Sequence, residues 1–148
     1  SVRYPGLISW KTLPGGGTTD YAVEIFHDAL EKGSYDCFLS EDTQLPMMYM
    51  DDAIRATREL MERNPEDVTV RSSYNLASMS FSPAELAESI QKEIPDFKMS
   101  FTPDFRQAIA DSWPKSIDDT KAQKDWDWQP EFDLKATTKA MLQNLKQS

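Results

Sequence analysis

The sequence predicts an α/β fold in which short strands alternate with amphipathic helices of about 10 to 15 residues. Two patterns support this prediction: apolar residues recur at helical spacing in four segments, and with a period of two in shorter ones. Residues that cap helices stand at the starts of those helical segments. A length of 148 residues with 39% hydrophobic content suits one compact domain with a core.

The N-terminal part of the chain predicts a strand and then a helix. Residues 2–8 indicate a short strand, which the turn-forming pair Pro5-Gly6 interrupts. A helix is expected over residues 18–32, because its apolar positions share one face and one of its first residues is a capping type. Gly33 is expected to end this helix.

The middle of the chain continues the alternation. Strands are predicted at residues 35–39 and 47–50. Residues 51–63 predict a helix, since they begin with acidic and end with basic side chains, which suits the helix dipole. An apolar stripe on this helix is expected to face a core, formed by Ile54, Thr57, Leu60 and Met61.

The C-terminal part shows the clearest helix start. Residues 70–81 predict a strand pair, or one strand and its extension. In the next segment Ser82 is expected to cap a helix, and Glu85 completes a capping box. Period-two alternation predicts a strand at residues 97–101, and a last helix is expected after Asp133.

Composition excludes several function classes. The net charge of −9 argues against nucleic-acid binding, which needs clustered Lys and Arg to neutralise phosphates. No apolar run reaches the roughly 20 residues that a membrane span requires. With Cys37 and His27 as the sole Cys and His, neither an intrachain disulfide nor a transition-metal site is expected. The lone Cys and the absence of a signal pattern favour the cytoplasm, or mitochondria if a targeting segment lies upstream.

The stretch PGGGTTDYAVEIF, at residues 14–26, is the strongest candidate for ligand binding. Three glycines before a helix start allow close backbone approach, and the free N–H groups there suit an anion. Phosphate is disfavoured, because the stretch contains no Lys or Arg and Asp20 is negative. A small zwitterion fits better, with its carboxylate near Thr18 and Thr19 and its ammonium near Asp20. The alternative is an ordinary turn followed by a helix cap.

Three longer motifs resemble the C-terminal half of the extended short-chain dehydrogenases, an epimerase-like superfamily with a Rossmann-type fold. They are RYPGLIS at residues 3–9, LPMMYMDDAIRAT at 45–57 and FRQAIADSWPKSIDDTKAQKDWDWQPEFDL at 105–134. Their order matches that of the superfamily over essentially the whole chain. The resemblance therefore implies that residues 1–148 form the substrate-binding portion of such a fold, and that the N-terminal dinucleotide-binding portion is absent from this chain.

Within that superfamily the motifs resemble the branch that acts on a small amino acid. The resemblance implies an enzyme, an oxidoreductase that converts L-threonine to 2-amino-3-oxobutanoate with NAD as cofactor. Members that act on nucleotide sugars carry an Arg five residues before the Asp-Asp helix start, where it contacts a diphosphate. Leu45 stands at about that place here. This difference agrees with the absence of basic residues beside the glycine loop.

The resemblance also assigns candidate site residues. It implies that Thr19 contacts the substrate, with Gly17, Thr18 and Asp20 around it. Trp113 is expected over the pocket, although a merely packed aromatic is the alternative. The nicotinamide side of NAD is expected to border Tyr4, Pro5, Gly6 and Leu7. Arg106 aligns with a phosphate-contacting Arg of the sugar enzymes, which leaves its role here open.

The catalytic residues of the superfamily are not found in this chain. None of the five tyrosines has a Lys four residues later, and no glycine-rich dinucleotide loop occurs. Activity is therefore expected only together with an N-terminal cofactor-binding half, in an enzyme that forms a homodimer when complete. Two alternatives remain: a nucleotide-sugar epimerase or dehydratase, and a non-catalytic, truncated substrate-binding module.

Overall fold

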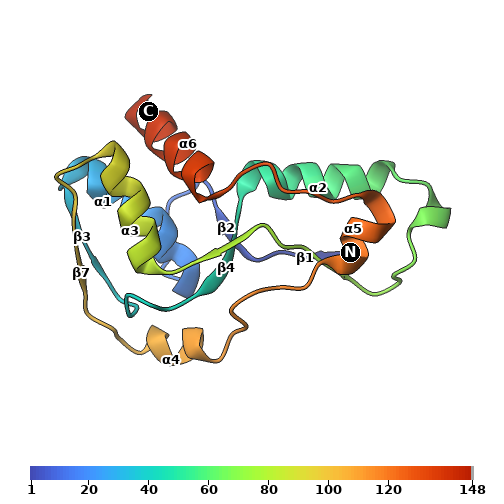
Figure 1. The fold of residues 1–148 in the computed structure, drawn as a ribbon, viewed down its shortest axis with the longest axis horizontal. Helices are drawn as coiled ribbons and strands as arrows, with labels where there is room; N and C mark the ends of the chain where they lie inside the picture. Colours follow the sequence, from blue (N-terminus) through green and yellow to red (C-terminus); the bar gives the residue numbers. More distant parts are fainter. Residues whose placement is uncertain (148) are drawn as a thin grey trace.

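The computed structural model describes residues 1–147, and Figure 1 shows its ribbon. Its strands are β1 (Val2–Arg3), β2 (Gly6–Ile8), β3 (Ser34–Cys37), β4 (Leu45–Tyr49), β5 (Tyr74–Asn75), β6 (Met79–Phe81) and β7 (Lys98–Phe101). Its α-helices are α1 (Tyr21–Glu31), α2 (Met50–Glu62), α3 (Pro83–Glu93), α4 (Arg106–Asp111), α5 (Thr120–Trp126) and α6 (Leu134–Gln147). Short 3₁₀ turns, η1 (Thr18–Asp20) and η2 (Pro65–Asp67), complete the described elements.

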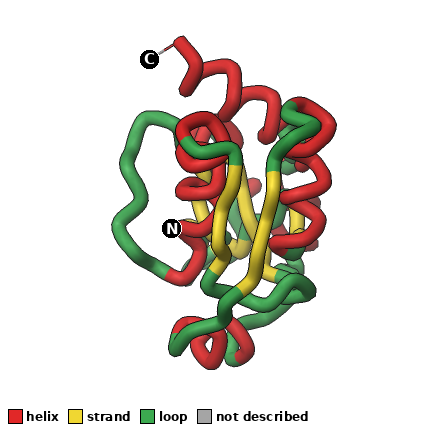
Figure 2. The backbone as a smooth tube through the Cα atoms, turned by 90° about the vertical axis from the view of Figure 1, so that its left-hand side faces the viewer, coloured by secondary structure: helices red, strands yellow, loops and turns green. Residues whose placement is uncertain are grey.

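The strands form three small sheets with helices packed around them (Figure 2). β1 pairs with β5 and β3 pairs with β7, both in parallel. In the third sheet β4 lies between a parallel β2 and an antiparallel β6. The predicted strand at residues 2–8 thus contributes to two sheets, because Tyr4 and Pro5 separate it into β1 and β2. The predicted interruption is confirmed at Pro5, whereas Gly6 is already the first residue of β2.

Two hydrophobic clusters lie at opposite ends of the elongated molecule (Figure 1). The larger joins the β2–β4–β6 sheet to α1, α3 and α6, with buried side chains that include Phe26, Phe81, Leu86 and Ile90. The smaller packs α2 and α5 around Tyr74, Trp126 and Trp128. The α/β class predicted from the sequence is therefore confirmed. None of the helices within residues 1–147 has the length and apolar character required to cross a membrane.

The predicted helix starts are confirmed with one correction. Around Ser82 the capping box forms as expected: the Glu85 N–H donates to the Ser82 hydroxyl at 3.3 Å, and the Ser82 N–H donates to the Glu85 carboxylate at 3.2 Å. The helix expected from residue 18 instead begins with the 3₁₀ turn η1, and α1 follows from Tyr21 without a side-chain cap hydrogen bond. Helices α4 and α5 were not predicted, because each is short and lacks a clear apolar repeat.

The expected orientation of α2 was wrong. Ile54 is 60% exposed and Met61 is 80% exposed, while the buried positions are Asp52, Ala53 and Ala56. Of the predicted stripe, Leu60 packs against the smaller cluster. The remaining positions line an open, mainly apolar groove with Tyr4 and Leu7, which we call the α2 groove; its other lining residues are Met50, Ala53, Arg58 and Glu62.

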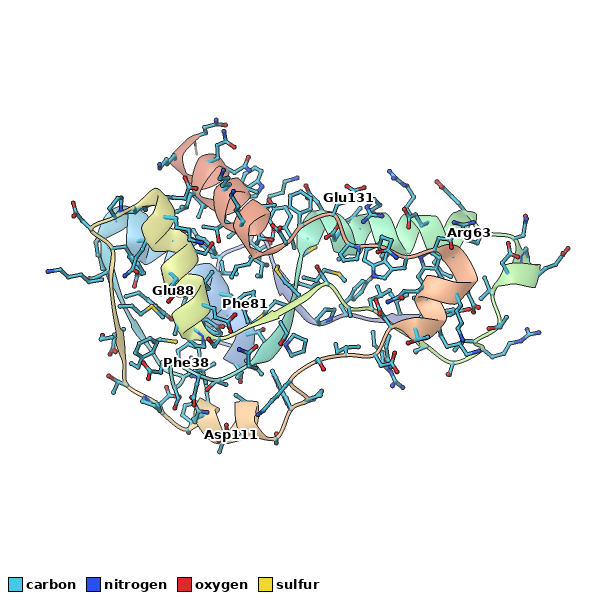
Figure 3. All side chains as sticks on the ribbon, viewed as in Figure 1. Phe38, Arg63, Phe81, Glu88, Asp111 and Glu131 are labelled. Atoms are coloured by element: carbon cyan, nitrogen blue, oxygen red, sulfur yellow. The ribbon has the colours of Figure 1, made fainter. Side chains whose placement is uncertain are left out.

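A buried carboxylate connects α2 to the segment that precedes α6. Asp52 accepts hydrogen bonds from the backbone N–H groups of Glu131 and Phe132, at 3.1 and 3.0 Å. The same carboxylate pairs with Arg55 at 3.0 Å. Figure 3 shows Glu131 on the segment that runs along α2. Trp128 donates its indole N–H to the Ala77 carbonyl at 3.0 Å, and its burial supports the structural role expected from the sequence.

Cys37 lies fully buried in β3, and burial raises the pKa of its thiol to about 11. A higher pKa means less thiolate, the form that reacts with alkylating reagents. We therefore expect Cys37 to resist iodoacetamide at pH 8 in the native protein and to react once the protein is denatured. Site-resolved mass spectrometry measures both rates, and fast native labelling would contradict the buried placement.

Candidate functional site

A single pocket collects residues from four separate parts of the chain. It has a volume of about 340 Å³, and we call it the site pocket. The described residues that line it are Tyr4, Pro5, Gly6, Thr19, Pro46, Trp113, Pro114 and Ile117. Five of them are predicted site residues, although residues 4 and 113 lie far apart in the sequence. The size falls within the usual range of small-molecule sites.

Close packing at Gly6 determines the place of Thr19. A methyl group on Gly6 would lie 2.8 Å from Thr19 Cγ2 and 2.7 Å from Met47 Sδ. Since real Cβ contacts are essentially never so short, only glycine allows η1 to approach β2 this closely. The Thr19 side chain therefore lies directly beside the Pro5-Gly6 backbone. Within the described residues the Thr19 hydroxyl has no hydrogen-bond partner, which leaves it available to a ligand.

The glycine loop already contains an anion of its own. One oxygen of the Asp20 carboxylate accepts the backbone N–H groups of Gly15 and Gly17, at 2.8 and 2.9 Å. Gly16 between them has a φ of 90°, a conformation that glycine adopts without strain. Donors that were expected to attract a ligand carboxylate thus bind Asp20 instead. The loop is a turn that Asp20 closes and that presents Thr19 to the pocket.

Arg106 contacts the glycine loop from outside the site pocket. Its guanidinium donates to the Gly16 carbonyl at 3.3 Å and to the Asp104 carboxylate at 2.7 Å. The hydrogen bond from Arg106 lowers the pKa of Asp104 below its ordinary value. The guanidinium carbon also lies 3.3 Å from the centre of the Phe38 ring. These contacts give Arg106 a structural part in this chain, and it does not line the site pocket.

One side of the site pocket is lined by the segment after α4, residues 112–119, through Trp113, Pro114 and Ile117. Trp113 is 41% exposed, and it lines the site pocket on one side and a small polar hollow beside α4 on the other. Gln107 fixes α4 to the preceding loop, because its side chain accepts the Ser40 N–H at 2.7 Å and donates to Thr43 at 3.0 Å. Farther along, the Ser80 hydroxyl donates to the Lys115 carbonyl. Asp111, labelled in Figure 3, marks the end of α4 at the edge of the molecule.

Not every candidate residue reaches the pocket. Leu7 lines the α2 groove instead, whereas Tyr4 borders both spaces and its hydroxyl hydrogen-bonds Thr57 on α2. Gly17, Thr18 and Asp20 support Thr19 without lining the pocket, and their direct contact with a ligand stays a prediction. On β4 the pocket-facing residue is Pro46, while its neighbour Leu45 is buried in the larger cluster.

Pro46, Pro114 and Ile117 are pocket residues that the sequence analysis missed. Pro46 follows Leu45, the position compared with the Arg of the nucleotide-sugar enzymes. Because successive residues of a strand face opposite sides, one of these two residues could have been expected to face a pocket. Ile117 had no comparable signal, because it lies in an irregular segment.

The chemistry of the lining limits what the pocket can hold. No Lys or Arg is found among the described residues around it, and its surface is mostly apolar. Apolar surface at Tyr4, Pro5 and Gly6 fits the nicotinamide ring of NAD, but nothing in this lining would bind the pyrophosphate. Across residues 1–147 no group of three or more His, Cys, Asp or Glu side chains is arranged to hold a metal ion.

The fold is that of the C-terminal portion of the epimerase-like, extended short-chain dehydrogenases, as the sequence predicted. No protein-family model matches the chain. Over 95% of its length the chain is 51% identical to the mitochondrial L-threonine 3-dehydrogenase of Bos taurus, of which it covers 38%. The solved GalE-like L-threonine dehydrogenase of Cupriavidus necator, in its holo form, superposes with a TM-score of 0.96 at 58% identity.

That alignment covers 98% of this chain and 47% of the Cupriavidus chain. A further relative is an uncharacterised epimerase/dehydratase of Staphylococcus haemolyticus, 48% identical over 99% of this chain and 46% of that protein. The chain thus spans less than half the length of each of these relatives. The resemblance to the threonine-oxidising branch is confirmed.

Proposed function

We propose that residues 1–148 are the substrate-binding portion of an NAD-dependent L-threonine 3-dehydrogenase, which oxidises L-threonine to 2-amino-3-oxobutanoate. The site pocket carries this proposal, because it brings Thr19 and Trp113 together with Tyr4, Pro5 and Gly6. Similarity to relatives that are named L-threonine dehydrogenases supports the same reading.

Each part of this chain has a distinct task in the proposed reaction. The Thr19 hydroxyl donates a hydrogen bond to the carboxylate of the amino acid, at a position that the close packing on Gly6 fixes. Trp113 and the segment after it cover the pocket and exclude water from it. Tyr4, Pro5 and Gly6 would border the nicotinamide of NAD, which supplies the hydride acceptor when bound. The group that takes the hydroxyl proton belongs to the portion outside this chain.

The remaining portion of the protein is the partner that we assign to the α2 groove. The groove is apolar, about 620 Å³ in volume, and contains Ile54 and Met61, which are unusually exposed for such side chains. Beside it β1 has one neighbour, β5, among the described strands, so its other edge is open to a further strand. Relatives more than twice as long as this chain would supply a cofactor-binding portion large enough to cover both features.

We expect Ile54→Asp and Met61→Asp to lower the melting temperature of the complete protein by several degrees, because a charge would enter a covered apolar face. Leu13→Asp is the matched control, since Leu13 is 77% exposed and lies outside the groove. Differential scanning calorimetry compares the three variants. Equal, small effects would contradict the assignment, and a changed oligomeric state would instead indicate that a second copy covers the groove.

The decisive experiment measures the activity of the complete protein with L-threonine and NAD. Threonine-dependent formation of NADH is the expected result. Turnover of a nucleotide sugar without threonine oxidation would favour an epimerase or dehydratase, the name that the Staphylococcus relative carries. The lack of Lys and Arg in the described pocket lining weighs against that candidate. Threonine binding without turnover would indicate a non-catalytic binding module.

Two further properties of the complete protein follow from the proposal. We expect a homodimer, which sedimentation or light scattering would measure. We also expect a cytoplasmic enzyme, or a mitochondrial one if a targeting segment precedes the chain, as the name of the bovine relative states for that protein. Microscopy of the tagged complete protein distinguishes these locations.

A further inference from the structure

A second cavity lies next to the site pocket, and two residues line both spaces. This second space, the adjoining cavity, measures about 240 Å³, and its described lining consists of Pro46, Ala77, Ser78, Met79, Ser80, Ser116 and Ile117. Pro46 and Ile117 also line the site pocket. These two side chains therefore form the partition between the spaces, and we call them the Pro46–Ile117 wall.

Ser80 on β6 lies next to both parts of the wall. Pro46 on β4 lies opposite Ser80 in the antiparallel register. The Ser80 hydroxyl donates to the Lys115 carbonyl, two residues before Ile117. Pro46 has little freedom of its own, since its ring fixes φ and its strand lies between two others. The wall is thus a defined boundary and not a chance contact between loops.

The wall is the apolar boundary of a pocket to which Thr19 contributes a hydroxyl group. An amino acid whose charged groups bind near Thr19 would direct its side chain toward the apolar surface. For L-threonine that side chain ends in the methyl group on the carbon that carries the hydroxyl. An apolar contact of this size changes discrimination between substrates about 10- to 200-fold.

We propose that the Pro46–Ile117 wall determines which 3-hydroxy amino acids the site accepts, by limiting the size of the substituent on the hydroxyl-bearing carbon. The inference rests on the proposed function and adds the feature that sets its substrate range. Shortening Ile117 to alanine removes most of one side of the partition and joins the site pocket to the adjoining cavity. A larger substituent, such as a phenyl ring, would then extend into the joined space, while the methyl group of threonine would lose its contact.

The test uses the complete protein and compares kcat/KM for L-threonine with kcat/KM for L-threo-3-phenylserine. We expect Ile117→Ala to raise the ratio of phenylserine to threonine at least about 10-fold, in line with the contribution of such apolar contacts. Ile109→Ala is the matched control, because Ile109 is 40% exposed on α4 and lines neither space; its ratio should not change. If Ile117→Ala fails to fold, Ile117→Val should shift the ratio in the same direction by a smaller factor.

The outcomes separate the two proposals. A wild-type protein that does not oxidise threonine would overturn the proposed function. A wild-type protein that oxidises threonine, with an Ile117→Ala or Ile117→Val ratio equal to that of wild type, would overturn the role of the wall alone.

Discussion

Thr19→Ala is expected to lower kcat/KM for L-threonine by about 10- to 150-fold in the complete protein, because hydrogen bonds to charged groups contribute about 1.5–3 kcal/mol. Thr19 has a free hydroxyl in the site pocket, and the Gly6 contact leaves its side chain little room to move. Thr19→Ser retains the hydroxyl and should have a much smaller effect. Affinity for NAD should change little in either variant, since we propose that the Thr19 hydroxyl binds the substrate.

A helix-cap role for Thr19 makes a different prediction. In that case both substitutions would lower the melting temperature, and activity would fall only with the loss of folded protein. The structure disfavours this alternative, because α1 begins without a side-chain cap hydrogen bond and the loop is closed by Asp20. Melting temperature and threonine kinetics, measured on wild type and both variants, decide between them. Unchanged kcat/KM per folded Thr19→Ala molecule would remove Thr19 from the site.

Asp52→Ala should destabilise the protein by about 1–3 kcal/mol, the cost of leaving buried hydrogen-bond donors without their acceptor. The Asp52 carboxylate is fully buried and accepts the N–H groups of two residues before α6, while Arg55, its ionic partner, is 18% exposed. Without the carboxylate those N–H groups lose their acceptor, and the segment beside α2 loses its attachment. Figure 3 shows how closely this segment, with Glu131, follows α2.

Asp51→Ala is the control for this substitution. Asp51 has the same charge and stands one residue earlier in the same helical turn, but it is exposed. Its removal should change the free energy of unfolding by no more than about 0.5 kcal/mol, as for ordinary surface positions. Denaturant unfolding of the complete protein measures both variants. Similar changes for Asp51→Ala and Asp52→Ala would show that the buried attachment contributes little.

Most of the element order could be read from local patterns. The capping box at Ser82 and Glu85, the strand interruption at Pro5 and the helix after Asp133 all appear in the structure as expected. Such signals work because caps, turns and apolar repeats act between residues a few positions apart. The short helices α4 and α5 escaped prediction for the same reason, since six and seven residues hold too little of a repeat.

The candidate site was predictable only in part. The motifs identified Thr19, Trp113 and the Tyr4–Gly6 border, and the structure places all of them around one pocket. They did not identify Pro46 or Ile117, because neither residue type suggests a site until its neighbours in space are known. Asp20 shows the converse, since its charge suggested a ligand contact, while the structure uses it to bind the N–H groups of Gly15 and Gly17.

The sequence by itself therefore determined the α/β class, most of the order of the elements and the likeness to the C-terminal half of an epimerase-like dehydrogenase. Only the tertiary structure decided which sides of those elements face the core, the pocket or an open groove. On α2 the apolar stripe was expected to face the core, but Ile54 and Met61 face the groove while Asp52 and Ala56 are buried. The physical reason is that a helical repeat defines a face, whereas burial of that face depends on segments that arrive from elsewhere in the chain or from outside it.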